Sequence, residues 1–416
     1  MTSPVARVPF NEQTDTTEFR MDPVTGHWTL ISEGRRHRPH SVHDHVGHVA
    51  SCVFCHGSER QTCATVADLS LDLTRFSSSQ TSAATGSYDL NAVINDALRN
   101  ANADNFILRA SCSQDDYSQQ SHRLWFVRSV ENKFPAFLKD DASTCATWLP
   151  QDASATWFKR VDAYGRHEVI VDSPRHIRGW EDFSDLEIEL AFRMFRSRLQ
   201  SLRAEGRYEH AFIFKNVGVN AGASQAHSHC QLTANFVTPP SVSHEMTRLA
   251  QYQADGNNSQ SRNFWREYLH AERQCGTRVI YADAQFLLWC PFASGNPMQV
   301  ELCQCFDGDF VDYDDATLRN FARLARDAVR ALQSLYRRQG SDKPLDYNVI
   351  LNHPPFVFKN SCAGACGFAR TRLTILPSIV KKAGFELGAQ IDINPLSPER
   401  VAYELRRVWD NSRMTF

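Results

Sequence analysis

Two long segments of the chain carry apolar residues at intervals of three or four positions. The first, residues 185–205, follows a capping box formed by Ser184 and Glu187 and is closed by Gly206. Apolar residues at this spacing lie on one face of a helix, and the capping box and the following glycine define its two ends. Residues 316–338 show the same spacing. The pattern therefore predicts two amphipathic helices.

Short runs of apolar and β-branched residues flank each predicted helix and predict strands. These runs are residues 167–172 and 210–215 in the first half, and residues 278–289, 299–304, 346–352 and 370–375 in the second. The repeated strand–helix–strand order indicates a duplicated unit, although so common an order also recurs by chance. Two prolines within residues 238–240 mark the expected boundary, which predicts an N-terminal domain of residues 1–238 and a C-terminal domain of residues 239–416.

The segment before the first of these strands is less regular. Residues 21–31 predict a turn that leads into a strand. Residues 61–120 are rich in Ser, Thr, Gln, Asp and Asn. That composition predicts an inserted, partly mobile surface segment with one short helix near residues 90–98.

Composition narrows the class of protein. The chain has 416 residues, of which 42% are hydrophobic and 22% are charged, with a formal charge of −2. These values are typical of a soluble globular protein and argue against a nucleic-acid binder. Residues 1–20 lack the apolar core of a secretory signal, and no apolar run is long enough to span a bilayer. Twelve cysteines without such a signal indicate reduced thiols. We therefore expect a cytoplasmic protein that does not act on a membrane.

The segment of residues 222–231 carries the most informative chemistry. It places His227, His229 and Gln231 behind a turn of small residues. One imidazole can bind a metal while the other acts as a nucleophile, and small residues let main-chain N–H groups approach an anion. Glutamine offers an uncharged donor where negative charge develops during phosphoryl or nucleotidyl transfer. An ordinary histidine pair on a strand is the alternative interpretation.

A pair of cysteines, Cys52 and Cys55, has the spacing of a zinc knuckle. A redox pair or two unrelated cysteines would have the same spacing. If the pair holds a metal, two further ligands must come from elsewhere, and His167 and His227 are the best candidates. The alternatives are His56, His176 and His210.

These motifs resemble the galactose-1-phosphate uridylyltransferase family of the histidine-triad superfamily. The matching segments occur in order along the chain: residues 22–28, 35–39, 52–55, 130–136, 165–174, 216–231, 383–388 and 393–395. Serine rather than proline between the two histidines resembles the branch that also contains sugar-nucleotide phosphorylases. The resemblance implies an α+β fold of two histidine-triad-like units with antiparallel sheets and flanking helices, and a homodimer.

The resemblance also implies roles for individual residues. His229 would attack the α-phosphorus of a nucleoside diphosphate sugar, and Gln231 would bind a non-bridging oxygen of the transferred group. The implied substrate-binding residues are Arg35, Arg38, Asn132, Asn216, Ser224 and Glu386. The implied ligands of a structural Zn²⁺ ion are Cys52, Cys55, His167 and His227. Relatives often carry histidines in the second half, where this chain has residues 303–306 and the Arg-Thr-Arg sequence of residues 370–372.

Three functional hypotheses follow. The first is a hexose-1-phosphate uridylyltransferase that moves UMP between sugar 1-phosphates by a ping-pong mechanism. The second is a phosphorylase of ADP-glucose or another nucleoside diphosphate sugar that uses the same covalent intermediate. The third, from another class, is a zinc-stabilised nucleotide-binding protein without turnover. The intact set of Ser224, His229 and Gln231 argues against the third.

Overall fold

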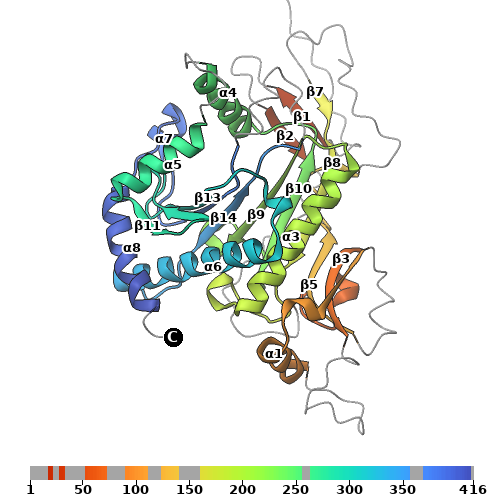
Figure 1. The fold of residues 1–416 in the computed structure, drawn as a ribbon. Coiled ribbons are helices and arrows are strands. Elements are labelled where there is room, and N and C mark those ends of the chain that lie inside the picture. The colour runs from red at the N-terminus through yellow and green to blue at the C-terminus, as the bar shows by residue number, and fades with distance from the viewer. Residues whose placement is uncertain are drawn as a thin grey trace, which may run out of the picture.

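The computed structural model of the protein describes residues 17–21, 28–32, 52–72, 90–110, 123–139, 160–254, 263–356 and 369–413. In these residues the fold is α+β, with one large, almost entirely antiparallel sheet and flanking helices (Figure 1). The predicted fold class is therefore confirmed. Among the helices of the described residues, none combines the length and the apolar character needed to cross a bilayer.

Within the described ranges the large sheet has twelve strands, and only the short β6 pairs in parallel. In spatial order they are β11 (Val279–Ala282), β12 (Phe286–Trp289), β13 (Val300–Gln304), β15 (Arg372–Pro377), β14 (Tyr347–Asn352), β9 (His210–Val217), β10 (His229–Asn235), β8 (Tyr164–Val171), β5 (Arg123–Glu131), β3 (Thr65–Asp72) and β4 (Phe106–Ala110), with β6 (Leu138–Lys139) beside β8. A separate small sheet contains β2 (Trp28–Ser32), β1 (Thr17–Met21) and β7 (Arg160–Asp162).

Seven α-helices flank the sheets in the part of the chain that the structure describes. They are α1 (Leu90–Asn100), α3 (Asp185–Glu205), α4 (Pro240–Ala254), α5 (Phe264–Cys275), α6 (Asp315–Arg338), α7 (Gly384–Ala389) and α8 (Pro398–Arg413). Figure 1 shows the two longest, α3 and α6, crossing the same face of the large sheet. Their aromatic residues meet in the main core, where the rings of Phe192 and Phe321 lie 5.9 Å apart.

The capping signals of α3 work as the sequence predicts. Ser184 Oγ accepts a hydrogen bond from the Glu187 N–H, and the Glu187 carboxylate accepts one from the Ser184 N–H at 2.8 Å. Gly206 ends the helix with φ of 66°, a left-handed conformation that glycine adopts without steric cost. The second predicted helix is confirmed as α6, and the short helix predicted near residues 90–98 as α1.

The two halves of the chain have the same strand order around a shared junction. In the first half β8, β10 and β9 accompany α3, and in the second half β13, β15 and β14 accompany α6. The halves meet where β9 pairs antiparallel with β14, with Asn216 opposite Asn348. Strands from both sides of the expected boundary at residues 238–240 thus belong to one continuous sheet. The two-domain division therefore stays a prediction.

One expectation about the polar segment needs correction. Within residues 61–120, β3 is an interior strand that pairs with both β4 and β5. Its side chains Ala67, Leu69 and Leu71 alternate along the strand and are buried in the main core. An apolar face with period two forms a strand even in a polar composition, so this part of the segment belongs to the sheet rather than to a surface insertion.

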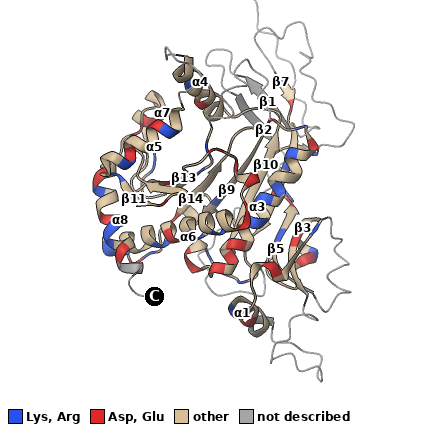
Figure 2. Ribbon diagram, viewed as in Figure 1, with Lys and Arg blue, Asp and Glu red and all other residues tan. Residues whose placement is uncertain are grey.

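Charged residues of both signs are interspersed along the helices (Figure 2). Several of them form ion pairs between α3 and α6, for example Arg319 with Glu189 at 2.7 Å and Arg326 with Asp185. These pairs link the two halves of the chain on the helical face of the sheet.

Candidate active site and metal cluster

The His227–His229 segment lies at the start of β10. Gly218 and Gly222, with φ of 87° and 80°, bracket a single 3-10 turn that reverses the chain after β9. These left-handed angles are readily adopted only by glycine. The Ser228 N–H then donates to the Ile177 carbonyl at 2.7 Å, and β10 begins its pairing with β8. The small-residue turn therefore fixes the position of the two histidines between the end of β9 and the start of β10.

A Cys₂His₂ cluster lies next to this segment. Cys52, Cys55, His176 and His227 each direct one ligand atom to a common point, and these atoms all lie within 4.8 Å of one another. His227 Nδ1 is 3.5 Å from each cysteine sulfur, and His176 Nδ1 is 3.4 Å from Cys55 Sγ. Tetrahedral zinc with ordinary Zn–S and Zn–N bonds would separate a sulfur from a nitrogen by about 3.5 Å. The cluster thus has the dimensions of a site that could bind a metal.

The chemistry of the cluster agrees with its geometry. A hydrogen bond from the Cys55 thiol lowers the pKa of Cys52 to about 3, and the same contact raises the pKa of Cys55. Thiolate is the form in which cysteine binds metals. His227 Nε2 lies 2.9 Å from the Ser173 carbonyl oxygen, and such a bond holds Nδ1 ready as the ligand.

The structure corrects the predicted ligand set at one position, because His167 does not lie in the cluster. His167 pairs with Thr233 on β10, whereas His229 pairs with Val171, so His167 lies four residues, about 13 Å, further along β8. His176, one of the alternatives, follows the end of the same strand and reaches the cysteines instead.

His229 is held in a defined orientation. Its Nδ1 lies 2.9 Å from the main-chain oxygen of His227, and the residue is 7% exposed. Burial lowers the pKa of His229 to about 4, so the ring is neutral near pH 7. The proton of a neutral ring then sits on Nδ1 and donates to that carbonyl, which leaves a lone pair on Nε2. No hydrogen bond to Nε2 occurs among the residues that the structure describes.

Gln231 lies two residues further along β10, on the same face as His229. His167 fixes its amide: the Ala136 N–H donates to His167 Nδ1 at 2.9 Å, so the ring proton sits on Nε2, which donates to Gln231 Oε1 at 3.0 Å. The carbonyl end of Gln231 is thereby occupied, and its NH₂ group remains as a donor. Asn132, a predicted nucleoside contact, lies beside them, with Nδ2 3.0 Å from His167 Nε2.

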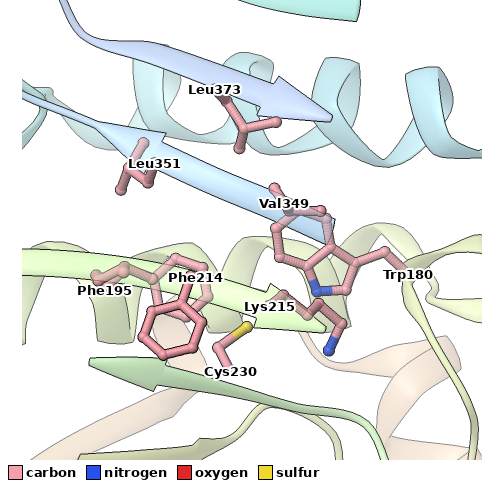
Figure 3. Close-up of a pocket in the computed structure, with 9 residues that line it drawn as sticks. Trp180, Phe195, Phe214, Lys215, Cys230, Val349, Leu351 and Leu373 are labelled. Atoms are coloured by element: carbon pink, nitrogen blue, oxygen red, sulfur yellow. The ribbon is translucent and has the colours of Figure 1, made fainter. Parts of the chain in front are cut away.

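A buried ion pair beneath β10 was not predicted. Lys215 and Asp172 are 2% and 0% exposed, and Lys215 Nζ donates to Asp172 Oδ2 at 2.8 Å. Lys215 also donates to Ser228 Oγ at 2.8 Å and to the His229 carbonyl at 3.1 Å. Figure 3 shows Lys215 beside Cys230 and Trp180, near the junction of the two halves. A lysine and an aspartate at the ends of two apolar strands are the sequence signal for such a pair.

The other predicted substrate-binding residues are more dispersed. Asn216 Oδ1 accepts a hydrogen bond from Asn348 Nδ2 at 2.8 Å, across the junction of the two halves. Ser224 lies in the loop that leads to His227. Glu386 accepts a hydrogen bond from the Ala383 N–H at the start of α7, which Figure 1 places near α5 and away from β10. Arg35 and Arg38 lie outside the described residues.

Comparisons with known proteins agree with this picture. A family model described as galactose-1-phosphate uridyl transferase, N-terminal domain, matches residues 113–239. An ADP-glucose phosphorylase from Arabidopsis thaliana is 25% identical over 398 residues, which cover 94% of this chain and 93% of that protein. A galactose-1-phosphate uridylyltransferase from Thermotoga maritima is 22% identical over 285 residues, which cover 67% of this chain and 83% of that protein.

The fold has a solved counterpart. The crystal structure of an ADP-glucose phosphorylase from Arabidopsis thaliana with bound ADP-glucose matches with a TM-score of 0.60 and 21% identity, covering 93% of this chain and 98% of that one. The chain is similar to proteins of the galactose-1-phosphate uridylyltransferase family and of its sugar-nucleotide phosphorylase branch, as its motifs predict.

Proposed function

We propose that the protein is a nucleotidyltransferase that moves a nucleoside monophosphate between phosphate acceptors through a covalent nucleotidyl-His229 intermediate. The observation that carries the proposal is the paired geometry of His229 and Gln231. His229 presents Nε2 as a lone pair, because Nδ1 donates to the His227 carbonyl. Gln231 presents its NH₂ group on the same face, because His167 occupies its carbonyl oxygen.

The first half-reaction follows from this pair. His229 Nε2 attacks the α-phosphorus of a nucleoside diphosphate sugar, and the bond from that phosphorus to the sugar phosphate breaks, so that the sugar phosphate leaves with the electron pair. Gln231 donates to a non-bridging oxygen as charge develops there. In the second half-reaction a phosphate acceptor attacks the same phosphorus, and Nε2 leaves with its electron pair.

Zinc is the metal that the Cys₂His₂ cluster fits, and we assign it a structural role. Cys52, Cys55, His176 and His227 would hold the ion and fill its four positions, leaving none open for substrate. The ion would thus fix His227, two residues before the nucleophile. The predicted substrate contacts remain part of the proposal: Arg35, Arg38, Asn132, Asn216, Ser224 and Glu386.

The donor and acceptor distinguish two versions of the reaction. The favoured version transfers UMP between UDP-glucose and a hexose 1-phosphate, and the metabolism of galactose is the corresponding pathway. The second version uses an ADP-sugar with inorganic phosphate as acceptor. It has its own support, since the similarity to an ADP-glucose phosphorylase extends over 94% of the chain. Both versions share His229 and Gln231.

The remaining parts of the proposal concern organisation. We assign residues 1–238 to a catalytic domain and residues 239–416 to a second histidine-triad-like domain with an altered motif. A cytoplasmic homodimer is the proposed form of the protein. Sedimentation of the purified chain as a monomer at micromolar concentration would overturn the dimer.

The mechanism is tested by the intact mass of the protein after brief incubation with UDP-glucose, UDP-galactose or ADP-glucose, each alone. We expect a mass gain of one nucleoside monophosphate, UMP or AMP, which also identifies the base. His229→Ala abolishes the gain, and the exposed His270→Ala serves as the matched control that keeps it. Zinc-replete, folded protein without an adduct from any donor would overturn the covalent mechanism for these donors and favour a binding protein.

A further inference from the structure

A polar cavity lies in the C-terminal half, at the start of β15. It has a volume of about 90 Å³ and is lined by the first turn of α4, the end of β14 and the residues that lead into β15. A water molecule needs only about 10–15 Å³ of such space. The cavity therefore has room for several waters, or for one small polar group that replaces them.

The cavity has the position in the second half that His229 has in the first. Arg372 is the first residue of β15, as His229 is of β10, and each strand lies between the two equivalent partners. The two places lie at opposite ends of the strands, because β9 and β14 are antiparallel: Asn216 pairs with Asn348, and Ile213 with Leu351. The cavity is thus separate from the proposed active site.

Arg370 is the most unusual residue of the lining. The residue is 2% exposed, and one terminal nitrogen pairs with Asp307. The other two guanidinium nitrogens, Nε and Nη1, are buried and have no hydrogen-bond partner in the described part of the chain. Leaving buried N–H donors of a charged group unpaired is costly. Arg370 therefore has the donors for an acceptor of one or more oxygens.

Two neighbours make the cavity suitable for an anion rather than a cation. Arg372 also lines it, held by a bidentate ion pair with Glu245 at 2.6 and 2.8 Å and stacked on Trp265 at 4.5 Å. Because this pair engages both Glu245 oxygens, the carboxylate is compensated. Ser241 and Val242 belong to the first turn of the fifteen-residue α4, where N–H groups lack an intrahelical acceptor and attract negative charge.

We propose that this cavity binds a small tetrahedral oxyanion of the inorganic phosphate class, held by Arg370 Nε and Nη1 and by the N-terminal amides of α4. The guanidinium group matches two oxygens of such an anion, and the helix end supplies further donors. The site is independent of nucleotidyl transfer and requires no covalent step.

The test uses the full chain and two measurements. Crystals are soaked with selenate, whose selenium is located by anomalous scattering, and thermal unfolding is followed in inorganic phosphate against chloride at equal ionic strength. We expect an anomalous peak beside Arg370 and an increase in Tm with phosphate, since a ligand that binds only the folded state stabilises it. Glucose 1-phosphate in a third arm shows whether a phosphate ester replaces the free anion there.

Variants separate this cavity from other phosphate sites. The His229→Ala protein serves as the background, and the Tm increase with phosphate that persists in it is the part ascribed to this cavity. Arg370→Met removes the donors and should abolish that remaining increase. Arg203→Met, at an exposed arginine, is the matched control and should keep it. If Arg370→Met does not fold, the proposal is tested instead with Arg370→Lys and with the selenate peak of the unmodified chain. An empty cavity, a bound metal, or selenate binding at crystal concentration only, without the Arg370-dependent stabilisation, would overturn the proposal.

Discussion

Replacing Lys215 by methionine would test how the ion pair beneath β10 supports the catalytic segment. Lys215 is 2% exposed and makes three hydrogen bonds, to Asp172 Oδ2, Ser228 Oγ and the His229 carbonyl. Methionine preserves most of the volume but leaves the Asp172 carboxylate buried without its cation. Removing one partner of a buried pair costs about 3–5 kcal/mol. Trp180 Nε1 still donates to Asp172, so we expect a loss in the lower part of that range.

A double-mutant cycle separates the lost pair from the lost volume. Asp172→Asn combined with Lys215→Met removes both charges, and replacement of a whole buried pair is often close to neutral. The double variant should therefore be more stable than Lys215→Met alone, by about 2 kcal/mol, if the stranded carboxylate is the main cost. Urea unfolding at fixed zinc concentration gives each free energy of unfolding.

The pH dependence gives the same reasoning a second test. Burial opposes ionisation of Asp172, but Lys215 outweighs it and lowers the pKa of the folded state. The wild type therefore gains stability from Asp172 as the pH rises above the folded pKa. Without Lys215, burial alone raises that pKa, and stability falls as the pH rises. The difference in free energy of unfolding between the wild type and Lys215→Met should widen from pH 4 to pH 7. At pH 7 it should reach the lower part of the range of about 3–5 kcal/mol. A loss below about 1 kcal/mol at pH 7, or a gap that narrows, would refute the pairing argument.

Three further predictions concern the site and the fold. His176→Ala should abolish the zinc content that we expect of the purified protein, measured by elemental analysis, while His167→Ala keeps it; the reverse result would restore the predicted ligand set. Gln231→Ala should slow formation of the nucleotidyl adduct by about 10²–10³-fold, because one donor to the developing charge is lost; an unchanged single-turnover rate would contradict this. Ser184→Ala should lower the free energy of unfolding by about 1 kcal/mol through loss of the α3 cap; unchanged urea unfolding would show that the cap contributes nothing.

Local signals in the sequence were sufficient to predict an element where neighbouring residues determine its structure. The bounds of α3 follow from Ser184, Glu187 and Gly206, because caps act within one turn of the helix end. The prediction for β3 failed for the opposite reason. Its alternation of Ala67, Leu69 and Leu71 lies within a polar composition, and its role depends on pairing with β5 far along the chain.

The metal ligands show the limit of spacing arguments. His167 lies within β8 and His176 follows its end, and which of them meets the cysteines depends on where Cys52 and Cys55 lie in space. Sequence spacing does not contain that information. For a similar reason the partners Lys215 and Asp172 were not recognised, since they come from different strands and meet only through the folded sheet.

The shared sheet also bears on how such a chain could arise or be divided. A gene fragment that ended near residue 238 would leave β9 without β14, and the backbone groups that face Tyr347 to Leu351 would lie open along a sheet edge. Open edges of this kind pair with other copies and aggregate. Asn348 of the second half also donates a hydrogen bond to the Ala221 carbonyl, in the turn before His227 and His229. The second half would therefore still be needed to pair with β9 and to hold this turn, even if it took no part in catalysis.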